Sequence, residues 1–119
     1  MYKVIKARLS EAPNPIRLVK NEIVKCIESS DENGEWAGWI YCKGNHKEGW
    51  VPKQIIEQMV DEGRILEDYD ATEFDLNVGE IIISEKLQNG WIYGTKTEDA
   101  GVKAWAPLNH LEKMGELRR

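Results

Sequence analysis

Polar and apolar positions along this 119-residue chain alternate over short runs and show no sustained helical period. The runs are rich in β-branched and aromatic residues, which favour extended strands. Turn-forming residues separate the runs, for example Asp31-Glu32-Asn33-Gly34 and Gln88-Asn89-Gly90. The best helical candidate, residues 53–60, is short and follows a proline. The pattern therefore predicts an all-β protein with strands near residues 22–28, 36–42, 81–85 and 91–95.

The same sequence pattern occurs twice along the chain. Paired runs keep their order while the distance between partners changes, as expected when loops between strands differ in length. Tryptophans stand at matching places in these runs, which makes chance a weak explanation. We infer an internal duplication, carried by Glu22-Ile23-Val24 with Glu80-Ile81-Ile82, Gly38-Trp39-Ile40-Tyr41-Cys42 with Gly90-Trp91-Ile92-Tyr93-Gly94, and Gly49-Trp50-Val51-Pro52 with Ala104-Trp105-Ala106-Pro107.

Each copy has the size and turn spacing of a small five-stranded barrel. We expect domain 1 at residues 1–59, a linker at residues 60–63 and domain 2 at residues 64–119. A linker this short and charged favours a restricted orientation of the two barrels, although independent tumbling stays an alternative. The predicted fold is thus all-β, with two tandem barrels joined by a very short linker.

The charge of the chain is uneven. Its net charge is −5, and residues 61–119, with seven Lys/Arg against thirteen Asp/Glu, account for −6 of it. An acidic surface repels phosphate backbones and attracts Lys- and Arg-bearing partners. We therefore expect a protein or peptide partner and no nucleic acid.

Other functional classes find little support in the residues. No stretch is long and apolar enough to span a membrane, and the opening residues alternate like a strand, so we expect a cytoplasmic protein. Neither the two histidines nor the two cysteines form a metal-ligand pattern, so we expect no metal and no cofactor. Cys26 and Cys42 are expected to be buried thiols on neighbouring strands, with a redox-sensitive pair as the alternative.

The second copy resembles the Src-homology-3 (SH3) family along its whole length. Ile65-Leu66-Glu67-Asp68-Tyr69-Asp70-Ala71 is similar to the family's opening strand, and Gly90-Trp91 is similar to its G-W-W-x-G segment. Pro107-Leu108-Asn109-His110-Leu111 is similar to its closing P-S-N-Y-V. The first copy resembles the pattern less closely, because Ala7-Arg8-Leu9-Ser10-Glu11 lacks the aromatic residues of that opening. The whole chain resembles a tandem of divergent, prokaryotic-type variant SH3 domains.

The resemblance implies a peptide-binding groove on domain 2. Extended polyproline-II ligands dock on such a groove with little loss of entropy, while an acidic loop receives a ligand Lys or Arg. Because Glu67 and His110 stand where the family usually has tyrosine, we expect a less proline-rich and more basic ligand. The residues implied to line the groove are Tyr69, Glu73, Asp75, Trp91, Pro107, Asn109 and His110.

The remaining tryptophans are assigned less directly. Trp39 of domain 1 is either a ligand contact or a packing residue against the neighbouring barrel, and the packing role is favoured. Trp50 and Trp105 precede the closing proline of each copy and are expected to pack. Trp91 is expected to point out of the barrel and into the groove.

Three functions compete at this stage. The favoured one is a non-catalytic adaptor whose domain 2 binds basic or proline-containing peptides. The alternative is a structural or oligomerisation unit, monomer or homodimer, that buries its aromatic residues between barrels or chains. Cell-wall or nucleic-acid barrels are disfavoured, because the chain shows neither a secretion signal nor a basic face. The acidic run around Glu73 and Asp75 has no neighbouring nucleophile or metal motif, so we do not expect an enzyme.

Overall fold

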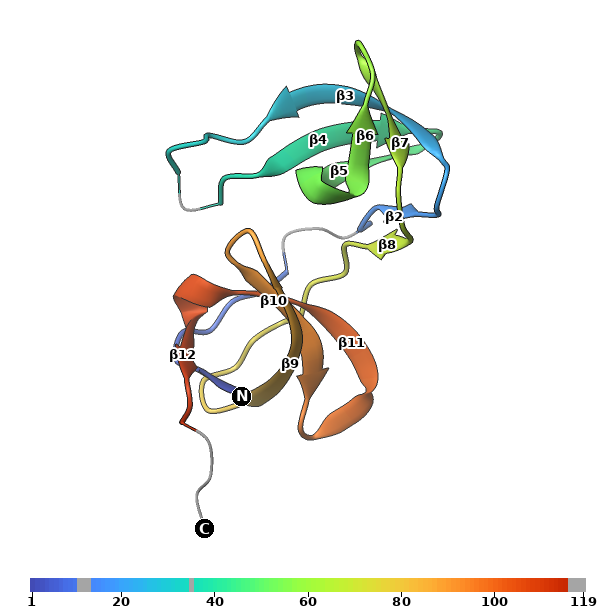
Figure 1. The fold of residues 1–119 in the computed structure, drawn as a ribbon. Helices are drawn as coiled ribbons and strands as arrows, with labels where there is room; N and C mark the ends of the chain where they lie inside the picture. Colours follow the sequence, from blue (N-terminus) through green and yellow to red (C-terminus); the bar gives the residue numbers. More distant parts are fainter. Residues whose placement is uncertain (11–13, 35, 116–119) are drawn as a thin grey trace. The chain divides into compact units, whose positions relative to one another are not determined.

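The computed structural model describes residues 1–10, 14–34 and 36–115. Within these residues the chain forms strands and two short 3-10 turns, with no α-helix (Figure 1). The all-β prediction is confirmed. The helical candidate at residues 53–60 contains the 3-10 turn η1 (Lys53–Ile55) and the strand β6 (Ile56–Gln58). No helix in the described part of the chain could cross a membrane.

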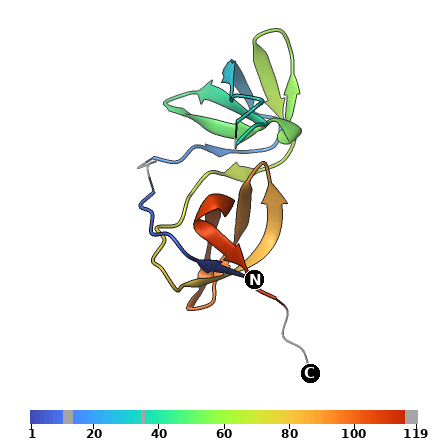
Figure 2. The same cartoon turned by 90° about the vertical axis from the view of Figure 1, so that its left-hand side faces the viewer.

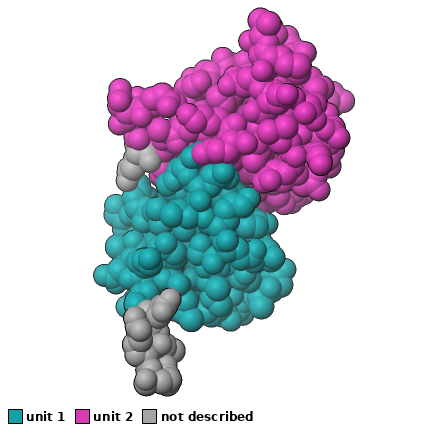
Figure 3. Space-filling view, viewed as in Figure 1, with its two compact units in different colours: residues 1–11, 73–119 teal, residues 12–72 magenta. Residues whose placement is uncertain are grey.

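The chain folds into two compact units, which Figure 3 colours separately. Unit 1 contains residues 1–11 and 73–119, and unit 2 contains residues 12–72. This division differs from the one predicted from the sequence. Residues 60–63, predicted to be a linker, lie inside unit 2, where they form the tip of a hairpin and the start of strand β7. Unit 2 is therefore one continuous segment inserted between the two parts of unit 1.

Unit 2 is built on a five-stranded antiparallel sheet with the order β5-β4-β3-β7-β6. A separate pair, β2 with β8, brings the two ends of the unit together. The core consists of aliphatic side chains from every strand of the sheet, together with the buried Cys42. The strands are β2 (Arg17–Leu18), β3 (Ile23–Ser29), β4 (Trp39–Gly44), β5 (Lys47–Pro52), β6 (Ile56–Gln58), β7 (Glu62–Ile65) and β8 (Tyr69–Asp70).

Unit 1 repeats this sheet with the order β11-β10-β9-β1-β12. Asn89 and Gly90, at φ angles of 51° and 88°, join β9 to β10 through the tight turn that the sequence predicted. Two successive positive φ angles match the twist of a two-residue hairpin, and glycine and asparagine tolerate them. The elements are β1 (Tyr2–Val4), β9 (Ile81–Gln88), β10 (Trp91–Lys96), β11 (Asp99–Pro107), η2 (Leu108–His110) and β12 (Leu111–Lys113).

The first strands of the two copies are exchanged. Strand β1 lies between β9 and β12, where Figures 1 and 2 show it in dark blue beside the red β12. Strand β7 lies between β3 and β6. Packing at Gly63 favours this arrangement, because a Cβ there would lie 2.4 Å from Cγ2 of Ile56 and 3.1 Å from Sγ of Cys26. Only a strand with glycine at this place enters unit 2 without displacing the core.

Candidate functional site

The structure divides the predicted groove residues between the two units. Tyr69 lies on β8 of unit 2, whereas the other six residues belong to unit 1. The place of Tyr69 in unit 1 is taken by Arg8, because Tyr69 pairs with Leu18 as Arg8 pairs with Leu76. Strand exchange therefore gives the tyrosine to the first copy and an arginine to the second.

Trp91 is not displayed as the sequence predicted. Its side chain is only 8% exposed, and the Arg8 guanidinium carbon lies 5.2 Å from the centre of its ring. The same guanidinium pairs with Glu73, with Nη1 2.6 Å from Oε1. A cation that stacks on an indole and pairs with a carboxylate makes both of its favourable interactions within the same unit. Arg8 thus engages two of the predicted groove residues within unit 1.

The other four predicted residues of unit 1 also have defined places. The Asp75 carboxylate accepts a hydrogen bond from the backbone N–H of Ser10 at 2.7 Å. Pro107 is fully buried at the end of β11, and Asn109 is exposed on η2. Nδ1 of His110 lies 3.2 Å from the backbone oxygen of Lys6. Of these four residues, Asp75 and Asn109 are exposed.

Unit 2 presents a different cluster of aromatic rings. The sequence analysis assigned Tyr69 to the groove and Trp50 to packing, and passed over Tyr41. Trp50 is 40% exposed, and the ring of Tyr41 meets it edge-on with the centroids 5.1 Å apart. Tyr69 adjoins them, since its hydroxyl donates to the Trp50 carbonyl oxygen at 3.1 Å. Trp39, the domain 1 candidate, is buried at the start of β4. Burial argues against a ligand contact for Trp39, and its packing against the neighbouring barrel stays a prediction. The exposure of Trp50 corrects its packing assignment.

Strand alternation explains why these rings face outward. Ile40 and Cys42 flank Tyr41 and point into the core, so the side chain of Tyr41 must lie on the other face. Its register partners are Glu28 on β3 and Trp50 on β5. Side chains directly opposite each other on neighbouring strands share a face. We call Glu28, Tyr41 and Trp50 the outer row of unit 2.

Unit 1 has an equivalent outer row with different chemistry. Tyr93 pairs with Lys86 on β9 and with Trp105 on β11. Its rings also touch, at 5.0 Å between centroids, but Trp105 is only 4% exposed. The backbone of Phe74 binds that of Trp105 through an N–H to O hydrogen bond of 2.9 Å. The outer row of unit 1 therefore has a lysine in place of the glutamate and a buried indole in place of the exposed one.

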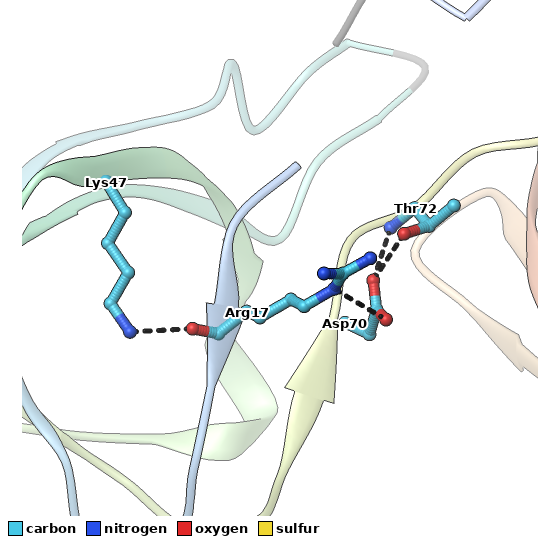
Figure 4. A network of polar contacts seen from close by, with 4 residues as sticks. All are labelled: Arg17, Lys47, Asp70 and Thr72. Atoms are coloured by element: carbon cyan, nitrogen blue, oxygen red, sulfur yellow. Dashed lines mark hydrogen bonds and ion pairs between the residues drawn. The ribbon is translucent and has the colours of Figure 1, made fainter. Parts of the chain in front are cut away.

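Carboxylates reinforce the acidic character of the outer row of unit 2. The Tyr41 hydroxyl donates to Glu48 at 2.5 Å, and this bond raises the pKa of Tyr41 above its ordinary value. Burial opposes ionisation of Asp70, but hydrogen bonds from Thr72 and Arg17 outweigh it and lower the Asp70 pKa (Figure 4). Tyr41 is therefore a neutral hydrogen-bond donor at neutral pH, and Asp70 is ionised and paired with Arg17.

An open hollow of about 720 Å³ adjoins Glu48. Its Lys and Arg residues are Arg17, Lys43 and Lys47, and each is already in an ion pair with a carboxylate. Lys47 donates to the Arg17 carbonyl oxygen at 2.7 Å (Figure 4) and pairs with Glu22 at 2.6 Å. The hollow is therefore a weak candidate for binding an anion.

The net charge also differs between the two structural units. Residues 12–72 contain seven Lys/Arg and twelve Asp/Glu, which gives −5. The remaining residues contain nine of each and are neutral. The negative charge of the chain thus resides on the unit with the exposed rings.

The two cysteines lie on neighbouring strands, as predicted. Cys26 and Cys42 are register partners on β3 and β4, and both are free thiols. Burial raises the pKa of Cys42 to about 12 and moves that of Cys26 in the same direction. Thiols that resist ionisation react slowly, so both behave as small core residues. Among the described residues, no cluster of three or more His, Cys, Asp or Glu side chains could hold a metal ion.

Two small all-β units, each with a five-stranded sheet and a 3-10 turn that leads into an edge strand, β6 or β12, define an SH3-like fold. A family model described as the variant SH3 domain matches residues 1–58. No significant match was found among curated proteins or among solved structures. SH3-like domains are in general protein-interaction modules. The matched segment crosses the structural division, because its first strand lies in unit 1 and the rest in unit 2.

Proposed function

We propose that the chain is a non-catalytic protein-interaction module that binds short basic or proline-containing peptides through unit 2. The observation that carries this proposal is the exposed Trp50 beside Tyr41 and Glu28 on an acidic unit. This exposure supports the outer row of unit 2, rather than the surroundings of Trp91, as the proposed binding surface. Unit 1, whose Trp91 is covered by Arg8, has a supporting role.

The chemistry of the outer row fits such a ligand. Flat rings offer large contact areas with few rotatable bonds, and an extended proline-rich segment loses little entropy on docking. A ligand Lys or Arg gains from the Trp50 ring and from the nearby carboxylates of Glu28 and Glu48. Exposed charges of this kind mainly raise the association rate, so binding should weaken as salt increases.

A peptide array with fluorescence titration tests the proposal. Full-length protein is probed with peptides that vary independently in proline and Lys/Arg content, and the best binder is titrated against Trp50→Ala. We expect at least a tenfold loss of affinity, because an indole at the centre of a contact is typically worth 2 kcal/mol or more, or roughly thirtyfold.

Tyr93→Ala is the matched control, because Tyr93 holds the place of Tyr41 in the outer row of unit 1. We expect it to leave peptide affinity within a factor of two. If Trp50→Ala binds every detected peptide as tightly as the intact chain, the outer row of unit 2 is not the binding surface.

A further inference from the structure

The slot that β1 fills in unit 1 is lined on both sides by backbone groups. β1 is a central strand, so it bonds to β9 on one side and to β12 on the other. The Val4 N–H donates to Glu80 O at 2.8 Å, and the Ile5 N–H donates to His110 O at 2.9 Å. Val4 itself is fully buried in the core of unit 1. A strand that leaves this slot exposes two unpaired strand edges and a core position.

The backbone pattern of this slot is repeated in unit 2. There the Ile65 N–H donates to Glu22 O at 2.9 Å, and the Leu66 N–H donates to Ile55 O at 2.8 Å. These bonds are the counterparts of those of Val4 and Ile5, with β7 in place of β1. Backbone hydrogen bonding alone therefore cannot decide which first strand enters which unit.

Side-chain volume decides which first strand can enter the slot of unit 2. Tyr2 of β1 and Gly63 of β7 hold the same register place, opposite Lys113 and Gln58 respectively. In unit 2, even a Cβ at this place would lie within 3.1 Å of Cys26 Sγ and closer still to Ile56, so tyrosine is excluded. In unit 1, Tyr2 is accommodated, partly buried against the core. β1 therefore fits a unit 1 slot and is rejected by a unit 2 slot.

We propose that the unit 1 slot also accepts β1 from a second copy of this chain, so that two chains exchange first strands and form a dimer. All 61 residues of unit 2 separate residues 1–11, which include β1, from the rest of unit 1 along the chain. The slot makes the same backbone bonds and core contacts whichever copy supplies the strand. Exchange of an identical element between copies is a low-cost route to dimers, since every native contact is restored.

Disulfide capture between two full-length variants tests this directly. Cys26→Ser and Cys42→Ala remove the native thiols from both chains, and circular dichroism confirms that each chain folds. One chain carries Lys3→Cys and the other Glu112→Cys, because residues 3 and 112 are exposed register partners. Directly opposed strand residues lie within the Cα separation that a disulfide spans.

The matched control replaces Glu112→Cys with Glu57→Cys, the equivalent exposed place beside β7 in unit 2. We expect the 3–112 pair to give a covalent dimer at least fivefold more abundant than the 3–57 pair, with a yield that rises with concentration. Equal yields would mean random collision, and no dimer at millimolar concentration would mean no exchange. Either result overturns the proposal, and neither depends on peptide binding.

Discussion

The two units share a backbone plan and differ in what they present. Both carry a touching Tyr–Trp pair across the same two strands, yet Trp50 is 40% exposed and Trp105 only 4%. The third member of the outer row is Glu28 in unit 2 and Lys86 in unit 1. Unit 1 also covers its Trp91 with Arg8. After duplication, one copy can thus keep exposed aromatic side chains, while in the other copy the unit's own residues cover them.

Strand exchange is part of this difference. It gives Tyr69 to unit 2, where its ring packs against the core and its hydroxyl meets Trp50. It gives Arg8 to unit 1, where the guanidinium engages Trp91 and Glu73. Neither unit has the surface that its own contiguous sequence repeat would have given it.

The largest effect is expected from cutting the chain. A fragment of residues 12–72 contains all of unit 2, and its ends are joined by the β2–β8 pair and by the Ala71 N–H to Ile16 O bond of 3.0 Å. It should unfold cooperatively in urea. A fragment of residues 64–119 lacks the central strand of unit 1 and should show no cooperative transition. The reverse outcome, with only the second fragment folded, would contradict the exchange.

A single substitution at the exchange point should have the next largest effect. Gly63→Val places methyl groups into the contact with Ile56 and Cys26, where even a Cβ is too close. We expect a loss of about 2–3 kcal/mol in the free energy of unfolding, as for overpacked cores. Gly101→Val is the control on unit 1, since a Cβ there comes no nearer than 3.7 Å to its neighbours. Similar losses at both sites, measured by urea denaturation, would refute the steric argument.

The cover over Trp91 can be removed with Arg8→Ala. The substitution leaves Glu73 without its partly buried partner, and we expect a loss of about 1–3 kcal/mol, less than for a fully buried pair. It should also expose the Trp91 indole, which 19F NMR of fluorotryptophan-labelled protein detects as a solvent-induced shift. An unchanged Trp91 signal would show that Arg8 does not cover the ring.

Much of the fold could be predicted from the sequence because strand patterning is local. The strands around Trp39 and Trp91, and the Asn89-Gly90 turn, follow from alternation and turn chemistry. The exchange could not be predicted, because β1 and β7 offer the same backbone groups to either unit. The deciding feature is the room at Gly63, which depends on how Ile56 and Cys26 pack in three dimensions.

The candidate site could be predicted only in part, because the exchange of first strands decides which residues lie together. Tyr69 was recognised, but its grouping with Trp91 assumed contiguous domains. Trp50 was assigned to packing, although the alternation of Ile40, Tyr41 and Cys42 places the Tyr41 neighbour on the outer face. That alternation was the available signal. The covering of Trp91 by Arg8 requires the exchanged strand and carries no sequence signature of its own.

Exchanging the charges of the two outer rows tests the comparison of the units further, and its expected effect is smaller. Glu28→Lys gives unit 2 the residue that unit 1 has at the same place in its outer row. We expect a loss of about 1 kcal/mol in the binding free energy of a basic peptide, seen mainly as slower association in stopped-flow fluorescence. Lys86→Glu in unit 1 should leave that rate nearly unchanged. Equal effects of the two variants would indicate long-range attraction without a local site.

Chemical-shift mapping of a basic, proline-containing peptide onto the full-length protein tests the central claim most directly. Two-dimensional 1H–15N NMR resolves the indole N–H of every tryptophan together with the backbone amides. We predict saturable shifts at Trp50 and around Glu28 and Tyr41, with little change at Trp91. Shifts concentrated at Trp91, Asn109 and His110, with Trp50 unmoved, would contradict the assignment of the binding surface to unit 2.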